Sequence, residues 1–207
     1  MNEHVSPIRP QDAASVGALL ALSHAEYPAF VHLFPGPVAR HDILLAFLTA
    51  TAADAARQGG ALLARDQHGV LGAALWMPPH TFPLTPLRKA RMTPAMLRIA
   101  LRAPREFRDF ARVGSYLEGT MPVESAWYLQ AMGVHPRAQR RGIGRQLLAP
   151  VLAMADHAAI SCHLHTSDPA NVDYYRQHGF QVSDPAIAVT PAGPRYIAMS
   201  RTPSHPQ

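Results

Sequence analysis

The sequence predicts an α/β protein in which strands and helices alternate along a single domain, residues 1–207. The apolar run 127–134 is typical of a buried strand, and apolar residues at helical spacing follow it after a turn rich in Arg and Gly. A second strand, helix and strand are indicated between 161 and 183. A chain of this length can bury a sizeable core.

The N-terminal third is expected to hold two helices and a hairpin after a short strand. In order, these are a strand at 5–9, a helix from 12 to about 24, a helix at 38–58, and hairpin strands at 60–65 and 70–77. We expect Asp12 to cap the first helix. The hairpin turn at 66–69 ends in glycine, as such turns often do.

Residues 78–122 are rich in Pro and Arg and form an expected insertion, with helical pieces near 86–100 and 104–117. The elements expected after it are a strand at 126–134, a helix at 139–157, a strand at 161–166, a helix at 169–178, and strands at 179–183 and 195–200. Pro150 should kink the helix at 139–157 or remove one of its backbone bonds.

The turn between 134 and 145 predicts an anion site. It joins a strand to a helix N-terminus, where the first amides lack partners within the helix and the helix dipole adds partial positive charge. A nucleotide P-loop is excluded because no Lys-Ser or Lys-Thr is present and Lys89 is the only lysine. A dinucleotide fingerprint needs three glycines, and only Gly142 and Gly144 are placed for it.

Two motifs carry a resemblance to a known family. The run Gln139-Arg140-Arg141-Gly142-Ile143-Gly144 matches Q/R-x-x-G-x-G/A, and Tyr175-x-x-x-Gly179-Phe180 follows about thirty residues later, with Asn171 four residues before the tyrosine. In both, the chain resembles the GCN5-related N-acetyltransferases (GNAT), which hold the pyrophosphate of acetyl-coenzyme A on the first turn. Outer segments, such as 29–35 and 193–201, are similar to a bacterial branch of unassigned substrate.

The resemblance implies a GNAT fold, a mixed and mostly antiparallel central sheet flanked by helices. The strand at 126–134 would carry a bulge and splay from the strand at 161–166, with the pantetheine arm of acetyl-CoA between them. The cofactor-binding residues that it implies are Met132, Gly133, Val134, Gln139, Arg140, Arg141, Gly142, Ile143, Gly144, Arg145 and Asn171. Asn171 is equally suited to cap the helix that it opens.

The implied activity is acetyl-CoA-dependent N-acetyl transfer to a primary amine, by direct transfer in a ternary complex. Tyr175 would be the general acid that protonates the sulfur of coenzyme A, since a phenol stays protonated at neutral pH. Tyr174 points elsewhere on the same helix and is expected to be structural. The acceptor would be a small-molecule amine or a peptide amine. The alternative is a catalytically silent, acetyl-CoA-binding regulatory protein.

The general base is left open, because the strand at 126–134 holds no carboxylate. Its polar candidates are His24, Glu26, Glu124, Tyr128, Gln130, His135 or water. The acceptor wall is expected to come from the N-terminal helices, the segment after Met77 and the insertion. Aromatic residues that could line it or fill the core are Phe30, Phe34, Trp76, Phe82 and Trp127.

Composition sets the remaining expectations. The formal net charge of +5 is concentrated among the arginines of 88–112, which form a solvated helix face or an electropositive rim and lack the interleaved aromatics of a nucleic-acid binder. His163 and His165 share a strand face, but no third ligand is recognisable, so no metal is expected. The lone Cys162, read as a small buried strand residue, fits a cytoplasmic protein, and no signal peptide or membrane span is visible. We therefore expect no nucleic-acid or membrane partner, and a monomer or homodimer.

Overall fold

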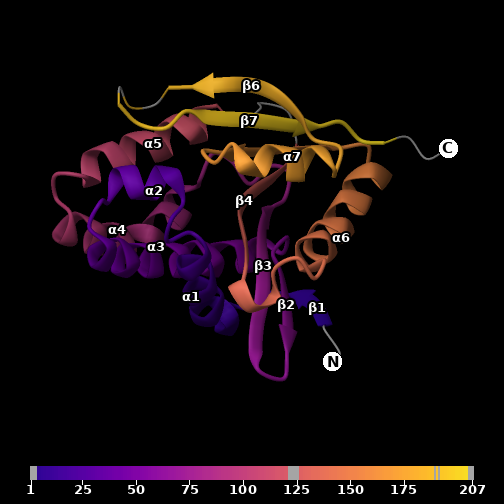
Figure 1. Ribbon diagram of the computed structural model, residues 1–207, viewed down its shortest axis with the longest axis horizontal. Helices are drawn as coiled ribbons and strands as arrows, with labels where there is room; N and C mark the ends of the chain where they lie inside the picture. Colours follow the sequence, from indigo (N-terminus) through magenta and orange to yellow (C-terminus); the bar gives the residue numbers. More distant parts are fainter. Residues whose placement is uncertain (1–3, 121–125, 189, 191, 205–207) are drawn as a thin grey trace.

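A central sheet runs through the computed structural model, which describes residues 4–120, 126–188, 190 and 192–204 (Figure 1). Within these residues the sheet has seven strands in the order β1-β2-β3-β4-β5-β7-β6. The strands are β1 (His4–Pro7), β2 (Leu62–Asp66), β3 (Gly69–Met77), β4 (Ala126–Val134), β5 (Ser161–Thr166), β6 (Gln181–Ile187) and β7 (Tyr196–Arg201). Only β4 and β5 pair in parallel, so the described sheet is mixed and mostly antiparallel.

Helices cover both faces of this sheet. They are α1 (Ala13–Ser23), α2 (Pro28–Leu33), α3 (Pro37–Gln58), α4 (Pro86–Arg102), α5 (Phe107–Gly119), α6 (Ile143–His157) and α7 (Ala170–Arg176), with short 3-10 turns η1 (Pro10–Asp12) and η2 (Pro136–Ala138). Figure 1 shows α1 to α5 gathered on one side of β3 and β4, and α6 on the other. None of the helices in the described residues has the length and hydropathy needed to cross a membrane.

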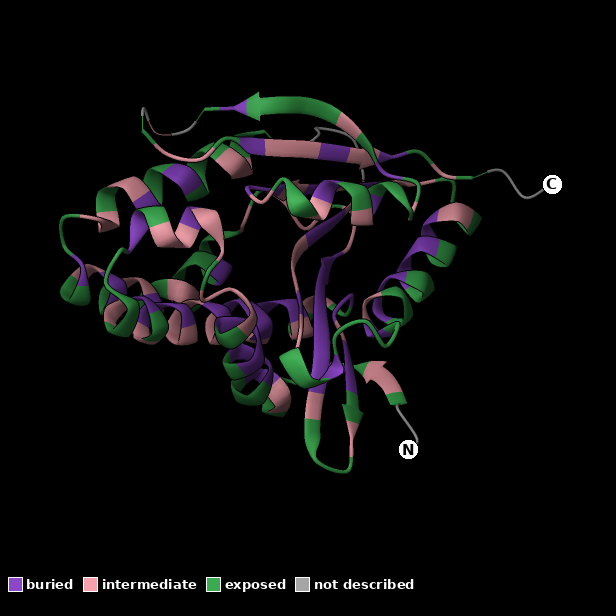
Figure 2. Ribbon diagram, in the orientation of Figure 1, coloured by how far each residue is buried: buried purple, intermediate pink, exposed green. Residues whose placement is uncertain are grey.

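The central strand β3 is buried on both faces, as Figure 2 shows. Leu71, Ala74 and Trp76 pack in the cluster that contains the apolar face of α6. Leu75 and Met77 pack in the opposite cluster, against α1 and α3. Alternate side chains of one strand therefore anchor two helical layers, which explains why this segment reads as an almost continuous apolar run.

Strand β4 carries the expected bulge and diverges from β5, as expected. Leu75 pairs with Ala131 and Trp76 with Leu129, so Gln130 is the extra residue of the bulge. The ladder between β4 and β5 runs from Ala126 and Ser161 only as far as Leu129 and Leu164. Beyond this point the two strands part, and the edge of β4 at residues 130–134 opens toward a wedge.

Several predicted boundaries were wrong, for local reasons. The helix expected at 139 begins at Ile143, because Arg140 and Gly142 have positive φ values of 59° and 80°, outside the helical region. Asp12 is the N-cap residue of α1, as expected, but its carboxylate makes no capping bond and accepts from the Arg9 amide and the Arg65 guanidinium instead. Helix α6 runs through Pro150, which has no backbone N–H and so removes one helical bond, as predicted.

Two further differences concern a helix that the sequence pattern did not predict and a strand that begins at another residue than predicted. Helix α2 was not expected; it begins at Pro28, which suits the first turn of a helix. The strand expected at 179 begins at Gln181, because Gly179 has a φ of 84° and belongs to the end of the preceding helix.

Candidate active site

The turn between β4 and α6 has the form of an anion cradle. His135 accepts a hydrogen bond from the Arg137 amide and holds η2, and the Gln139 side-chain amide donates to the Val134 carbonyl across the turn. Gly142 is the N-cap of α6 in the left-handed conformation, and its side chain position is open, with no atom within 4 Å of a Cβ built there. The first amides of a 15-residue helix therefore face an accessible space.

The two glycines of the motif serve different purposes. Gly142 is required by its φ of 80°, which other residues adopt only at a cost. Gly144 is required by packing, because a Cβ there would lie 2.3 Å from the phenol oxygen of Tyr174.

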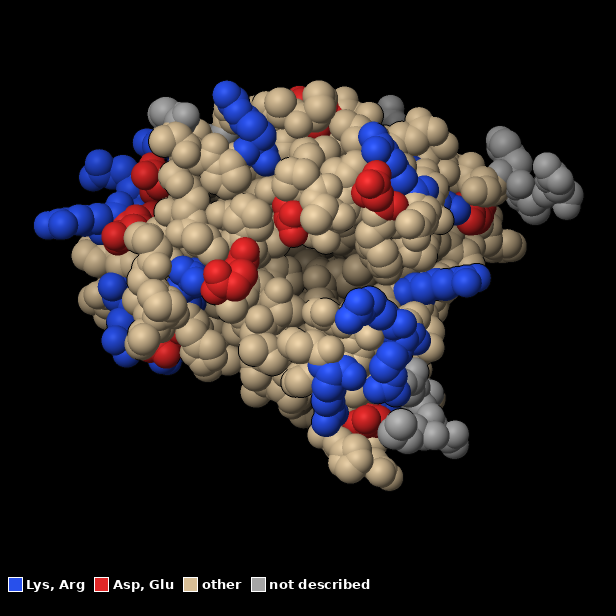
Figure 3. All heavy atoms as spheres, in the orientation of Figure 1, with Lys and Arg blue, Asp and Glu red and all other residues tan. Residues whose placement is uncertain are grey.

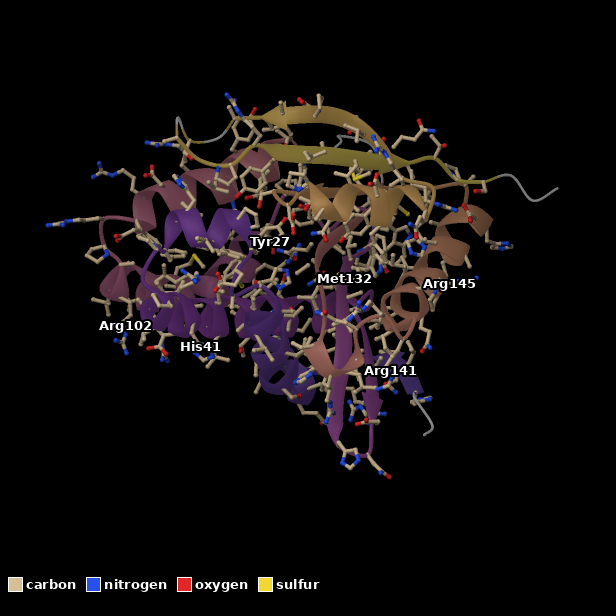
Figure 4. The ribbon with its side chains drawn as sticks, in the orientation of Figure 1. Tyr27, His41, Arg102, Met132, Arg141 and Arg145 are labelled. Atoms are coloured by element: carbon tan, nitrogen blue, oxygen red, sulfur yellow. The ribbon has the colours of Figure 1, made fainter. Side chains whose placement is uncertain are left out.

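Arginine side chains surround the cradle. In Figure 3, Lys and Arg side chains gather beside a hollow in the middle of the visible face, and Figure 4 places Arg141 and Arg145 on this side of the molecule. Arg137, Arg140, Arg141 and Arg145 are all exposed on this turn and the first turn of α6. The fixed amides, the open space over Gly142 and the local positive charge fit a diphosphate.

The open edge of β4 leads from the cradle into the interior. Met132, Gly133 and Val134 pair with Ala74, Ala73 and Gly72 of β3 on one side. On the side toward β5, the described residues place no strand beside them. This edge can accept an extended ligand as if it were another strand.

The far side of the wedge is tied to the N-terminal helices. The Tyr27 phenol oxygen lies 3.0 Å from the Thr166 hydroxyl and accepts from the Ser167 amide at 2.7 Å, while the Ala29 amide donates to the Ser167 hydroxyl. Asn171, predicted either to cap α7 or to bind the cofactor, is not the cap: the N-cap is Pro169, and the Asp168 carboxylate accepts from the Ala170 amide. Asn171 instead donates from its side chain to Thr166 and lines the cavity described next.

A cavity of about 510 Å³ fills the space between the wedge and α1 to α5. Its wall includes Gln130 and Met132 of β4 and Tyr175 of α7. Figure 4 shows Tyr27 and Met132 on either side of this central region. Burial raises the pKa of the Tyr175 phenol well above its ordinary value, so this group is fully protonated at neutral pH. The predicted general acid thus lies at the wall of the cavity and carries a proton.

The general-base candidates separate by position. His24, Tyr128 and Gln130 line the cavity, whereas Glu26 and His135 do not. Glu26 pairs with Arg40 and is 85% exposed. His135 holds the η2 turn. Glu124 lies outside the described residues.

His24 has the tautomer that a base requires. Its Nδ1 lies 2.9 Å from the Leu20 carbonyl oxygen, which can only accept, so Nδ1 carries the proton and Nε2 bears the free lone pair. Burial lowers the pKa of His24, and the imidazole is therefore neutral at pH 7. Tyr128, by contrast, is a poor base, because burial raises the pKa of its phenol.

His165 is a cavity residue that the sequence argument did not single out as a base. Its two ring nitrogens lie 3.3 Å from the Tyr128 hydroxyl and 3.4 Å from the Thr120 hydroxyl. Burial, with the nearby His163, lowers the pKa of His165 to about 4. The signal in the sequence was its position at the end of the strand that splays. No group of three His, Cys, Asp or Glu side chains suited to a metal occurs in the described part of the chain.

The aromatic candidates divide between the cavity wall and the core, and the lone cysteine lies in the core. Phe30 and Phe82 line the cavity, while Phe34 and Trp76 are buried in the core. Trp127 packs at the edge of the core beside Trp76. Cys162 is fully buried and burial raises the pKa of its thiol to about 12, which confirms it as a small core residue.

Part of the arginine-rich segment has an internal role. Arg88 is buried and makes three hydrogen bonds from its guanidinium to the Asp54 carboxylate, and another to the Thr81 carbonyl. Arg102 pairs with Asp42 and Arg112 with Asp109 at the surface. These pairs support the interpretation of a solvated helix face, with Arg88 fixing α4 to α3.

Comparison with known proteins agrees with this geometry. Residues 107–182 match the family model of the acetyltransferase (GNAT) domain. A solved Corynebacterium glutamicum structure, described as histone acetyltransferase HPA2 and related acetyltransferase, is similar over 100% of this chain and 99% of its own, with a TM-score of 0.71 and 22% identity. The polyamine N-acetyltransferase of Drosophila melanogaster has a TM-score of 0.65 and 13% identity over 97% of this chain and 100% of its own.

A third similar structure is the PaiA N-acetyltransferase of Thermoplasma acidophilum in complex with coenzyme A. Its TM-score is 0.61 and its identity 10%, over 98% of this chain and 99% of its own. At these identities the solved structures establish the fold alone, and the predicted fold is confirmed. The family match over residues 107–182 agrees with the predicted acetyltransferase class and with acetyl-CoA as its cosubstrate.

Proposed function

We propose that the chain transfers the acetyl group of acetyl-CoA directly to the nitrogen of a primary amine, with both substrates bound together. The observation that carries this proposal is one cavity that joins the open edge of β4, the Tyr175 phenol and the His24 imidazole. The acceptor is a small-molecule amine or a peptide amine, as for the polyamine enzyme among its structural relatives.

The cofactor side of the site follows from the backbone. We assign the pyrophosphate to the turn and the first amides of α6, and the pantetheine arm to the edge of β4 and to the Asn171 side chain. The assigned residues are Met132, Gly133, Val134, Gln139, Arg140, Arg141, Gly142, Ile143, Gly144, Arg145 and Asn171. When bound, acetyl-CoA supplies a thioester whose carbonyl carbon is open to attack.

Side chains of the protein then accept and donate the protons of the reaction. The amine nitrogen attacks the thioester carbon, the C–N bond forms and the C–S bond breaks. A backbone N–H of residues 132–134 polarises the carbonyl oxygen. The proton from the attacking nitrogen passes to His24 Nε2, and Tyr175 gives its phenolic proton to the leaving sulfur. The phenolate regains a proton through solvent from His24, which leaves an acetamide and a free thiol.

A weakly basic imidazole is sufficient in this cavity. An ammonium buried among apolar side chains has a lowered pKa, since burial disfavours its charged form. The amine therefore loses its first proton readily on binding. His24 then has only to accept the proton of a nitrogen that has already added to the carbonyl and is far more acidic.

Calorimetry with acetyl-CoA and a thiol-release assay with a broad amine panel test the proposal. Tyr175→Phe should lower kcat at least a hundredfold and leave the Kd for acetyl-CoA within twofold. The matched control is Tyr174→Phe, which removes the neighbouring phenol and should keep kcat. Equal turnover in wild type and Tyr175→Phe would remove Tyr175 from the mechanism.

Two further pairs of variants test the base and the cradle. His24→Ala should lower kcat without changing the Kd for acetyl-CoA, whereas His41→Ala, on the exposed face of α3 and outside the cavity, should leave kcat alone. Gly142→Val should weaken acetyl-CoA binding at least tenfold; Gly36→Val, at another open position with negative φ, should not. Acetyl-CoA binding without transfer to any amine would favour a silent regulatory protein instead.

A further inference from the structure

Aromatic rings line the part of the cavity beyond the wedge, together with aliphatic side chains such as Leu33, Leu48 and Met92. Phe30, Phe47 and Phe110 form a chain of edge-to-face contacts, with ring centroids 6.4 Å and 5.1 Å apart. Phe82 packs edge-to-face on Tyr128, 5.6 Å away. These rings come from α2, α3, α5, β4 and the segment after β3, and all line the same space. Such edges and faces favour another aromatic ring between them.

Formal charge in this wall is sparse and already paired. Among the described residues that line the cavity, only Lys89 and Glu118 carry a formal charge at neutral pH. Oxygen Oε1 of Glu118 accepts a hydrogen bond from the Leu84 amide at 2.8 Å and lies 3.8 Å from the Lys89 ammonium. Among these described residues, the one carboxylate is thus bonded by the main chain and lies beside the one ammonium.

This wall discriminates between classes of amine. A diamine or polyamine carries a second cation, which would lose its hydration without an unpaired carboxylate among the described lining residues to receive it. An arylalkyl monoamine has one amino group, which reaches the polar end of the cavity at His24 and Tyr175, and an apolar body that the rings cover. A volume of about 510 Å³ lies within the range of sites for small organic ligands.

We propose that the acceptor is a primary arylalkyl monoamine, selected by the aromatic wall and by the absence of a free carboxylate from the described lining of the cavity. This inference rests on the proposed acetyl transfer and adds its substrate class. Tryptamine and phenethylamine represent the proposed class, and putrescine and agmatine represent doubly cationic amines. A peptide with an apolar N-terminal residue represents the macromolecular alternative.

The experiment measures kcat/KM for these five acceptors with acetyl-CoA in excess, at one pH and ionic strength. Tryptamine or phenethylamine should exceed putrescine and agmatine by at least a hundredfold, and should exceed the peptide. A preference for a diamine or the peptide would overturn the inference while leaving the acetyl-transfer proposal intact. Bound acetyl-CoA with no transfer to any of the five, nor to any amine of the broad panel, would overturn both.

A matched pair of variants isolates the charge. Met96 of α4 lines the cavity and is half-buried, so Met96→Glu and Met96→Gln place side chains of equal size there, one charged and one neutral. Relative to Met96→Gln, Met96→Glu should raise kcat/KM for putrescine at least tenfold and should not raise it for tryptamine. The same putrescine-to-tryptamine ratio in both variants would show that charge in the wall does not set selectivity.

Discussion

The contact between Gly144 and Tyr174 yields a prediction whose magnitude follows from the structure. A methyl group at position 144 would lie 2.3 Å from the Tyr174 phenol oxygen, about 1 Å inside an ordinary van der Waals contact of at least 3.4 Å. The ring cannot withdraw freely, because it packs on Tyr175 and His178 with centroids 5.4 Å and 4.9 Å away. Gly144→Ala should therefore cost about 1–3 kcal/mol of unfolding free energy, the range for an overpacked site.

Removing the phenol oxygen should relieve most of this cost. The oxygen is buried without a hydrogen-bond partner among the described residues, so Tyr174→Phe alone should be neutral or slightly stabilising. In the double variant the nearest ring atom lies 3.2 Å from the new methyl, a tight but tolerable contact. The coupling free energy between the two substitutions should be about 1–2 kcal/mol.

Urea unfolding of the four proteins measures this coupling, and calorimetry measures their Kd for acetyl-CoA. If Gly144 acts through packing, stability and cofactor affinity should both recover in the double variant. If the methyl group instead blocks the phosphate directly, Tyr174→Phe will not restore affinity. Additive losses of stability would refute the packing argument. Gly142→Ala should show no such rescue, because its cost comes from a φ of 80° and not from a neighbour.

Two other predictions concern buried titratable and charged groups. Asp54→Ala leaves the buried Arg88 guanidinium without its carboxylate and should cost about 3–5 kcal/mol in urea unfolding, with a raised KM for the acceptor because α4 lines the cavity. Burial and the nearby His163 lower the pKa of His165 to about 4 in the folded protein, although Asp184 opposes this shift. In the unfolded chain the pKa is about 6.5. The unfolded state therefore binds more protons than the folded state as pH falls from about 7 to 4. Stability should fall by up to about 3 kcal/mol across this window, and His165→Gln should flatten the profile; an unchanged profile would contradict the assignment.

The elements that carry the proposed cofactor contacts could be predicted because they are made by backbone. The strand at 126–134 and the parting of β4 from β5 each follow from short-range patterns or from the two motifs. The packing constraint on Gly144 comes instead from Tyr174, thirty residues later in the chain. The spacing of the motif residues along the chain does not predict that contact.

The acceptor side could not be predicted in the same way. Phe47, Met96, Phe110 and His165 belong to four different elements, His24 follows α1, and each occurs in a pattern that equally fits a packed core. What distinguishes them is that they meet around one cavity, which depends on how α4 and α5 pack over the sheet. The pairing of Glu26 with Arg40 also depends on tertiary packing, because Arg40 belongs to α3.

Side-chain contacts, and not sheet hydrogen bonds, hold the ends of β4 and β5 at the wedge. Strands β4 and β5 share no ladder beyond Leu129 and Leu164, so their ends need another connection. The Tyr27 phenol, bonded to Thr166 and Ser167, supplies it by joining the N-terminal helices to the end of β5. The same Thr166 hydroxyl also receives the Asn171 side chain. The cluster of Tyr27, Thr166 and Asn171 therefore fixes the end of β5 beside the cavity that these three residues line.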